Sequence, residues 1–505
     1  MMLALKKREE LQQRICDYQT LVIRQIASTR AMQMSDYRFL DNPRVTVQAL
    51  VQALSDQCQS ALVPGQHYLA LQDTSEINLS AHRNRLNHAL PGIGTVGNDQ
   101  DLGFFIHPTL LINAHSCEIA GFSNVQIRTR RPHRSKERDA LYRKLDIGYK
   151  ESYKWLYSAE KTQEMLTQHH QHDSHHKTQN TQNTQIRVKL TMVGDRESDI
   201  YEYFRRCPED IQLLTRVRGD RLVIDSSQNL NWAEPEPEPE PERKNRKGRR
   251  STKIKEQKVK LYNLLNRQKV QGCFELPLEA DSRKKRDARV ALLEVRFTQV
   301  ALVKPHNLRK NGEGEYDPLA VSAIEVREHP RTRPAGEEGI LWRLFTTHSI
   351  QTFEQAVEAV RWYTLRWWIE LFFAALKGGG LNLERSQLES GLAIQRLTLL
   401  AFPAALKVMQ LQRGREDQES SSLKVFSAQE IDVLEILQKK LEGKTSKQKC
   451  SFVQGSMAWA TWVIARLGGW KGYVSERPPG VRTLHLGLKK FETFFFAWNI
   501  LKLDV

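Results

Sequence analysis

The chain has 505 residues, of which 40% are hydrophobic and 8% aromatic, so it can bury a sizeable core and is not a wholly disordered chain. Lysine and arginine number 76 against 59 aspartate and glutamate, and this net charge of +17 favours a polyanionic partner. Six widely spaced cysteines without a CxxC pair argue against a disulfide framework and against a zinc ribbon.

Two further observations concern localisation. The N-terminal residues lack the apolar run of a secretory signal, and together with the cysteine pattern this indicates the cytoplasm. The most apolar stretch, 397–409, is interrupted by Thr398, Pro403 and Lys407. We therefore expect no membrane-spanning helix and no membrane partner.

In chain order, residues 1–65 are expected to be a helical region, with one clear helix at 46–60. Two longer helical patterns follow in the second half of the chain, at 353–376 and 391–412. Short β-branched or alternating runs predict strands at 67–72, 104–113, 188–193, 213–217, 289–297, 321–326 and 340–346. This mixture of strands and helices indicates an α/β or α+β fold.

Two low-complexity segments are expected to be exposed insertions. Residues 162–185 are rich in His, Gln and Thr, and 233–258 contain a Glu-Pro repeat followed by the basic run 243–258. The basic run could add non-specific affinity for nucleic acid, with a solvated loop as the alternative. The histidines of the first segment could bind a transition metal, although a solvated polar tract is the favoured interpretation: His169, His170, His172, His175 and His176.

Two aspartates follow predicted strands directly. Asp73 ends the strand at 67–72, and Asp195 follows the strand at 188–193 and its Gly194. Strand ends are places where binding sites are built, but capping of the next turn is a common alternative role for each residue. Asp99 and Asp101 are rivals for the first acidic position, and we favour Asp73 because they lie in a Gly-rich loop.

A third acidic position lies in the helical pattern at 353–376. At about 100° per residue, Tyr363, Arg366, Glu370 and Lys377 fall within about 60° of one another, with apolar and aromatic residues opposite. A surface ion pair between residues i and i+4 is the alternative. Three carboxylates of this kind could bind two Mg²⁺ ions that act on a phosphodiester, with Arg366 and Lys377 beside them to hold phosphate oxygens.

The spacing Tyr363-x2-Arg366-x3-Glu370-x6-Lys377 resembles the Tyr-Arg-Glu-Lys signature of bacterial insertion-sequence DDE transposases of the cut-and-paste group. The segments around Asp73 and Asp195 resemble those that carry the two aspartates of this family. Weaker similarity covers most of the chain outside the two insertions, in the segments 35–43, 103–107 and 457–470.

The resemblance implies an RNase H-like catalytic core in which Asp73, Asp195 and Glu370 are catalytic and bind two Mg²⁺ or Mn²⁺ ions. It also implies that the core is split into 66–232 and 339–412, with the stalk and a β region inserted at 233–338. The remaining residues, 413–505, would form a C-terminal helical region that supports dimerisation, with ordinary core helices as the alternative for its tryptophans Trp459, Trp462 and Trp470.

The same resemblance implies double-stranded DNA, both transposon ends and target, as the partner of a homodimer. The residues expected to contact DNA are Tyr363, Arg366, Lys377, Trp367, Trp342, Arg216 and Arg218. For Trp342 a core position is an equal alternative, and for Arg216 and Arg218 so is the solvent face of a strand.

We therefore expect a transposase that cleaves insertion-sequence ends and transfers the strands to target DNA. Because only about 36 residues precede Tyr37, the end-recognising region is expected to be short by comparison with the family. Two alternatives follow: a DNA-binding regulator or inhibitor of transposition, and a stand-alone metal-dependent nuclease.

Overall fold

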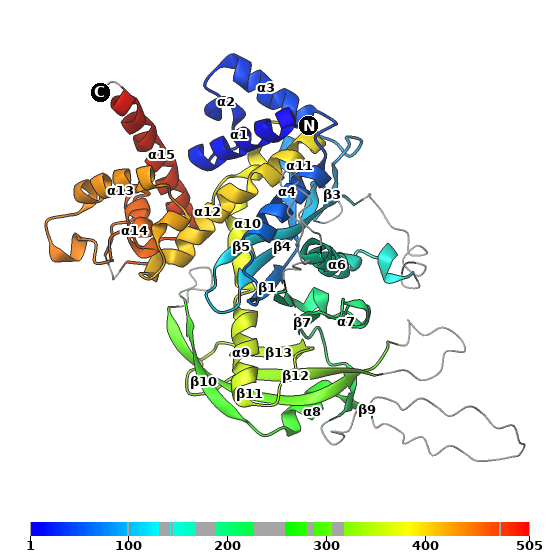
Figure 1. Cartoon of the computed structure of the whole chain (residues 1–505). Coiled ribbons are helices and arrows are strands. Elements are labelled where there is room, and N and C mark those ends of the chain that lie inside the picture. The colour runs from blue at the N-terminus through cyan, green and yellow to red at the C-terminus, as the bar shows by residue number, and fades with distance from the viewer. Residues whose placement is uncertain are drawn as a thin grey trace, which may run out of the picture.

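The computed structural model describes residues 2–97, 100–130, 142, 145–167, 187–226, 258–279, 287–305, 318–473 and 476–503. The five clustered histidines, Asp99, the Glu-Pro repeat and all of the basic run except Lys258 lie outside these ranges. Within them the chain is a mixed α/β fold, as predicted (Figure 1).

A single mixed sheet contains every strand named among the described residues, in the order β2-β4-β1-β6-β7-β13-β12-β11-β8-β9, with β3 and β5 on β4 and β10 on β11. The strands are β1 (His67–Gln72), β2 (Ser75–Asn78), β3 (Gly94–Val96), β4 (Asp101–Asn113), β5 (Ile119–Arg128), β6 (Lys189–Gly194), β7 (Ile211–Arg216), β8 (Leu222–Asp225), β9 (Lys258–Lys260), β10 (Gly272–Leu278), β11 (Arg289–Leu302), β12 (Leu319–Glu328) and β13 (Leu341–Thr346). All seven predicted strands are confirmed, and β11 extends beyond its predicted end at 297.

Strand directions divide the sheet into two parts. β5, β4 and β1 are antiparallel neighbours, whereas β6 lies parallel to β1 and β7 lies parallel to β6. β13 then pairs antiparallel with both β7 and β12. The predicted inserted β region is thus continuous with the rest of the sheet, and β8, placed at 222–225 in the first core segment, pairs with β11 of that region.

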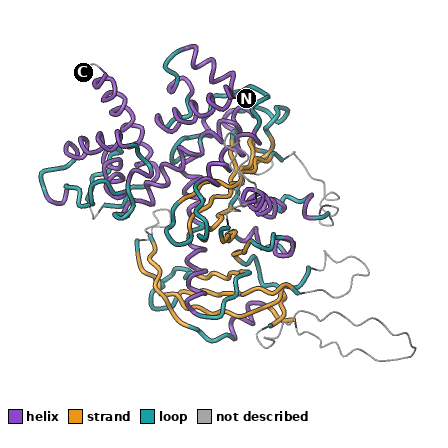
Figure 2. Tube along the Cα trace, viewed as in Figure 1, coloured by secondary structure: helices purple, strands orange, loops and turns teal. Residues whose placement is uncertain are grey.

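Helices cover this sheet and form both ends of the chain (Figures 1 and 2). They are α1 (Met2–Tyr18), α2 (Ile23–Ile26), α3 (Arg30–Asp41), α4 (Val47–Ser60), α6 (Tyr153–Thr167), α7 (Tyr201–Arg206), α8 (Leu261–Arg267), α9 (Phe353–Thr364), α10 (Trp367–Leu376), α11 (Gly391–Leu400), α12 (Phe402–Arg413), α13 (Ala428–Leu441), α14 (Met457–Leu467) and α15 (Val481–Leu503). The helical character expected of residues 413–505 is confirmed.

The central strands are buried on both faces, and every residue of β1 is buried. Leu69 and Leu71 belong to the hydrophobic cluster that contains the α9 and α10 side chains, whereas Tyr68 and Ala70 belong to the cluster formed with α6. This alternation follows from the two-residue repeat of a strand. Residues of odd number on β1 therefore face α10.

Three boundaries differ from the prediction. The pattern at 353–376 forms α9 and α10 rather than one helix, and the pattern at 391–412 divides into α11 and α12 at Ala401, where Pro403 cannot donate a backbone hydrogen bond. The first insertion does not begin at Thr162. Helix α6 continues to Thr167, because Thr162, Met165 and Leu166 are buried against the sheet.

Among the described residues, one helical segment is long and apolar enough to cross a membrane. It spans Gly391–Glu416, and 78% of its most apolar window is buried inside the protein. This burial is that of a core helix, because the apolar side chains of α11 and α12 pack against α1, α4, α10 and α15.

Candidate functional site

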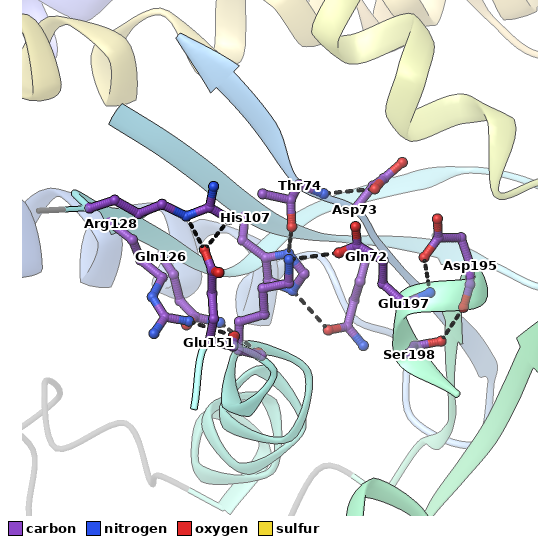
Figure 3. A network of polar contacts seen from close by, with 12 residues as sticks. Gln72, Asp73, Thr74, His107, Gln126, Arg128, Glu151, Asp195, Glu197 and Ser198 are labelled. Carbon is purple, nitrogen blue, oxygen red and sulfur yellow. Dashed lines mark hydrogen bonds and ion pairs between the residues drawn. The ribbon is translucent and has the colours of Figure 1, made fainter. Parts of the chain in front are cut away.

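Asp73 and Asp195 follow equivalent positions of two paired strands. Leu71 of β1 pairs with Val193 of β6 in a parallel register, so the two aspartates come two residues later at the same edge of the sheet. Both continue the odd-numbered face that carries Leu69 and Leu71, the face covered by α10. The sequence placed each aspartate at a strand end, and the parallel pairing brings the two together (Figure 3).

The Asp73 carboxylate is held by the backbone of the next residue and by Arg366 beside α10. Its Oδ1 accepts a hydrogen bond from the Thr74 backbone N–H at 2.7 Å, and its Oδ2 lies 2.8 Å from Nη1 of Arg366. The two residues are separated by 293 positions in the chain. The pair is mostly buried, so this contact is a specific link between β1 and the start of α10 rather than a surface ion pair.

Asp195 also caps the turn after its strand, as the alternative interpretation required. Its Oδ1 accepts from the Glu197 backbone N–H at 2.9 Å, and its backbone oxygen accepts from Ser198 Oγ at 2.7 Å. Gly194 makes this turn possible, because a Cβ there would lie 2.4 Å from Ser198 Oγ and 3.1 Å from the Trp155 ring. Capping and membership of the site are therefore compatible roles for Asp195.

The interruption between α9 and α10 places Arg366 at the N-cap of α10, directly before its first residue. The Leu365 and Arg366 backbone N–H groups bond to the carbonyls of Trp362 and Tyr363, three residues back, as in a 3₁₀ turn. Arg366 then reaches Glu370, with Nη2 2.6 Å from Oε1, while its Nη1 remains on Asp73. One guanidinium thus connects the first and third predicted carboxylates.

The charges at this edge influence one another. Burial raises the pKa of Asp73 to about 6, and the negative charges of Asp195 and Glu370 add to the shift while Arg366 opposes it. Asp195 and Glu370 are therefore close enough to Asp73 to act on it electrostatically, while burial is the main cause of the shift. The Arg366 guanidinium has its pKa raised by Asp73 and Glu370, against the effect of its own burial.

Carboxylate oxygens are the ligands that Mg²⁺ and Mn²⁺ prefer. Glu370 Oε2 and Asp195 Oδ2 make no hydrogen bond to any described residue, so each acid keeps an oxygen available to a cation. Within the described ranges no three His, Cys, Asp or Glu side chains lie close enough together to form a metal-binding group as they stand. The donor chemistry fits a hard divalent ion, and the position of Arg366 between Asp73 and Glu370 separates two of the three acids.

Tyr363 is buried at the end of α9 but remains close to the charged groups of the site. It is 6% exposed, its ring meets Trp342 edge-on at 5.7 Å, and its hydroxyl bonds to Arg216. Burial raises the pKa of this hydroxyl, Arg366 and Arg216 oppose the shift, and the negative charge of Asp195 adds to it. The break between α9 and α10 therefore leaves Tyr363 within electrostatic reach of Arg366 and Asp195. Trp342 has a partly buried position in the same cluster.

Three other predicted DNA contacts lie nearer the surface. Trp367 is 57% exposed at the start of α10, and Arg218 is exposed beyond the end of β7. Lys377 directly follows α10 and already has protein partners. Its Nζ donates to the Glu76 carbonyl at 2.8 Å and lies 3.2 Å from Glu384. Glu384 was not identified from the sequence, where it is one of many charged residues in a Gly-rich stretch.

A buried polar network behind Asp73 was also missed (Figure 3). His107 on β4 is 1% exposed, with Nδ1 2.9 Å from Thr74 Oγ1 and Nε2 3.3 Å from Gln72 Oε1. Burial lowers the pKa of His107 well below its usual value, so the ring is neutral. Since Gln72 Oε1 only accepts, Nε2 donates to it and Nδ1 accepts from Thr74. The network fixes the two residues on either side of Asp73.

The rival acid Asp101 belongs elsewhere. It lies at the start of β4, where it accepts from Arg83 at 2.9 Å and from Asn78 at 3.0 Å, and hydrogen bonds from Asn78 and Ser80 lower its pKa. These bonds give Asp101 a structural role. The choice of Asp73 over Asp101 agrees with this geometry.

A cavity of about 770 Å³ lies at the other end of the same strands. Its lining includes His67 at the start of β1, Lys189 at the start of β6 and His348 after β13. It is therefore separate from the carboxylate edge.

A scan of the sequence against protein-family models finds no match.

Proposed function

We propose that the protein is a DDE transposase that cleaves DNA at insertion-sequence ends and joins the released ends to target DNA. The observation that carries the proposal is the meeting of three acids from distant parts of the chain: Asp73 and Asp195 at register-paired strand ends, and Glu370 joined to Asp73 through Arg366. An ordinary helix-surface ion pair would not extend to Asp73.

The strand order supports an RNase H-like core. In the sheet, the antiparallel strands β5, β4 and β1 are followed by the parallel strands β6 and β7. Asp73 follows β1, Asp195 follows the neighbouring β6, and Glu370 lies on the covering helix α10. The β-rich part formed by β8 to β12 enters between Asp195 and Glu370 in the sequence. The resemblance implies a β region inserted between the second aspartate and the glutamate.

Two divalent ions held by Asp73, Asp195 and Glu370 would activate the attacking water or hydroxyl and stabilise the leaving oxygen. Arg366 orders two of the acids and carries charge that can hold a phosphate oxygen. The DNA backbone would be contacted by Lys377, Arg216 and Arg218. The exposed Trp367 offers a surface on which an unpaired base can stack.

The C-terminal helix supports the proposed homodimer on DNA. Trp459 and Trp462 are buried in α14 and belong to the core, as the alternative interpretation held. In contrast, Phe494, Phe496 and Leu501 of α15 are exposed. An apolar surface of this kind is typical of a contact with a second protein chain.

The deciding experiment uses a supercoiled donor plasmid with the matching terminal repeats, in Mg²⁺ or Mn²⁺. The parent protein should nick the donor plasmid, excise the element and join its ends to target DNA. Glu370→Gln should reduce the rate of all three reactions by about 10³-fold or more, since a catalytic carboxylate is lost. Glu358→Gln changes an exposed glutamate on α9 and is the matched control. Equal cleavage by parent and Glu370→Gln would overturn the proposal.

The same assay separates the alternatives. Binding of the ends without nicking in Mn²⁺ would identify a regulator or inhibitor. Hydrolysis without any joined product would identify a stand-alone nuclease.

A further inference from the structure

A second cavity, about 560 Å³, lies between the two ends of the chain. It is bounded by α1, by α12, by the start of α13 and by α15, so that residues near position 17 face residues near position 492. Helix α1 packs against both α12 and α15 at this place. None of the residues that line it belongs to the carboxylate edge, and the proposed cleavage chemistry makes no use of it.

Acidic groups outnumber basic ones in this cavity. Asp17, Glu430 and Glu492 line it, and Lys407 is the cation that faces them, with Nζ 3.3 Å from Glu430 Oε1 and 3.8 Å from Glu492 Oε1. Lys424 also lines the cavity, but it forms an ion pair with Glu118. One lysine therefore faces three carboxylates.

Two of these carboxylates have hydrogen-bonding partners. Asp17 Oδ1 accepts from Gln13 Nε2 at 2.6 Å. Glu430 completes the capping box of α13, where its Oε2 accepts from the Ser427 backbone N–H at 2.6 Å. Their positions are thus explained by local structure.

Glu492 has no such explanation. Glu492 lines the cavity and is 6% exposed, and its Oε1 accepts no hydrogen bond from any described residue. A buried acceptor without a hydrogen bond is destabilising, more so when it is charged. Burial raises the pKa of Glu492 to about 8, with Asp17 and Glu430 adding to the shift and Lys407 opposing it. A hydrogen-bond donor with positive charge would remove this cost.

The other walls indicate the kind of cation. Tyr18, Phe495 and Phe496 line the cavity beside the acids. The Phe495 ring is stacked between Phe491 at 6.0 Å and Trp498 at 6.1 Å, so it is held in place. Aromatic rings next to carboxylates recognise organic ammonium groups, whereas metal ions need several ligands around one point.

We propose that this cavity binds a primary alkylammonium group, with Glu492 as the principal acceptor and the Phe495–Phe496 wall against the alkyl chain. The cavity is large enough for a short linear diamine, and a lysine side chain presents the same chemistry. Its occupant contacts α1 and α15 together and therefore stabilises the packing of the N-terminal helix on the C-terminal helix.

Isothermal titration of the full chain with 1,5-diaminopentane tests this site, with 1,5-pentanediol as an uncharged ligand of the same length. The diamine should bind saturably and the diol should not. Glu492→Gln should weaken binding about tenfold or more, the value of a charge-assisted hydrogen bond. Asp432→Asn on the exposed side of α13 is the matched control and should bind as the parent does.

Glu492→Gln keeps the size of the side chain and one acceptor oxygen and adds no charge, so the variant is expected to fold as the parent does. Titration with Nα-acetyl-lysine amide distinguishes the two sources of the group. Binding of this compound alone identifies a protein lysine as the occupant, and binding of the diamine identifies a free amine. Equal affinity of parent and Glu492→Gln, equal binding of diol and diamine, or no binding of either amine would overturn the proposal.

Discussion

Asp73 at the end of β1 and Arg366 at the start of α10 are joined by an ion pair of 2.8 Å across 293 positions of sequence. The same guanidinium also holds Glu370 at 2.6 Å. This contact fixes the helix to the strand end at the place where the three acids meet. It also makes Arg366 the residue on which the relative positions of Asp73 and Glu370 depend.

Replacement of Arg366 should therefore affect stability more than an ordinary surface change would. Arg366→Met leaves Asp73 and Glu370 without their shared partner, and we expect a loss of about 1–3 kcal/mol in the free energy of unfolding. Arg361→Met, at an exposed position on α9, should change it by less than about 0.5 kcal/mol. Urea titration at pH 7 measures both. Equal losses would show that the Asp73–Arg366–Glu370 contact adds nothing.

Gly194 should be required for the turn that carries Asp195. Gly194→Ala places a methyl group 2.4 Å from Ser198 Oγ, and the strain is expected to cost about 1–3 kcal/mol and to lower DNA cleavage. Adding Ser198→Gly should restore part of both losses, because it removes the clashing side chain. Gly219→Ala, where a Cβ meets nothing within 4 Å, is the control. Thermal unfolding and plasmid nicking report the two effects, and failure of the double variant to recover either would contradict this explanation.

The histidine pair in the larger cavity should make stability depend on pH. Thr191 Oγ1 lies 2.8 Å from Nε2 of both His67 and His348, and burial lowers the pKa of each histidine to about 4. An unfolded chain binds these protons near pH 6.5, so stability should be full above pH 6.5, fall as the pH decreases, and level off below pH 4.

Denaturant titrations between pH 7.5 and pH 4 measure this slope. Each histidine contributes at most about 3 kcal/mol over the whole range. His348→Gln should reduce the slope, whereas His88→Gln at an exposed position should leave it unchanged. A parent protein whose stability is flat across this range would contradict the prediction.

Replacing either of two tryptophans in the signature region should have a different effect: loss of Trp362 should lower stability, and loss of Trp367 should weaken DNA binding. Trp362 is 8% exposed and meets His67 at 4.7 Å, so Trp362→Ala should cost about 3–5 kcal/mol of stability. Trp367 is 57% exposed, and Trp367→Ala should leave stability within about 0.5 kcal/mol. It should instead weaken binding of DNA with an unpaired end by about 1–3 kcal/mol, through lost stacking on the base. Calorimetry and gel-shift titration separate the two, and unchanged DNA binding by Trp367→Ala would remove this residue from the proposed interface.

Local sequence patterns predicted the elements well where a short apolar run ends at a polar stretch. The β1 strand was predicted with its observed limits, and all six of its residues are buried. The same reasoning was wrong where a helix is interrupted without glycine or proline. Nothing in the sequence around Leu365 marks the 3₁₀ turn, after which Arg366 reaches Asp73.

The sequence by itself predicted the three acids, since strand ends and helical spacing are local properties of the chain. The tertiary structure decided which residues hold them in place. Parallel pairing of β1 with β6 aligned Asp73 with Asp195, while Arg366, His107 and Glu384 acquired their roles through contacts between segments far apart in the chain. Such contacts leave no periodic signal, because they depend on the path of the whole sheet.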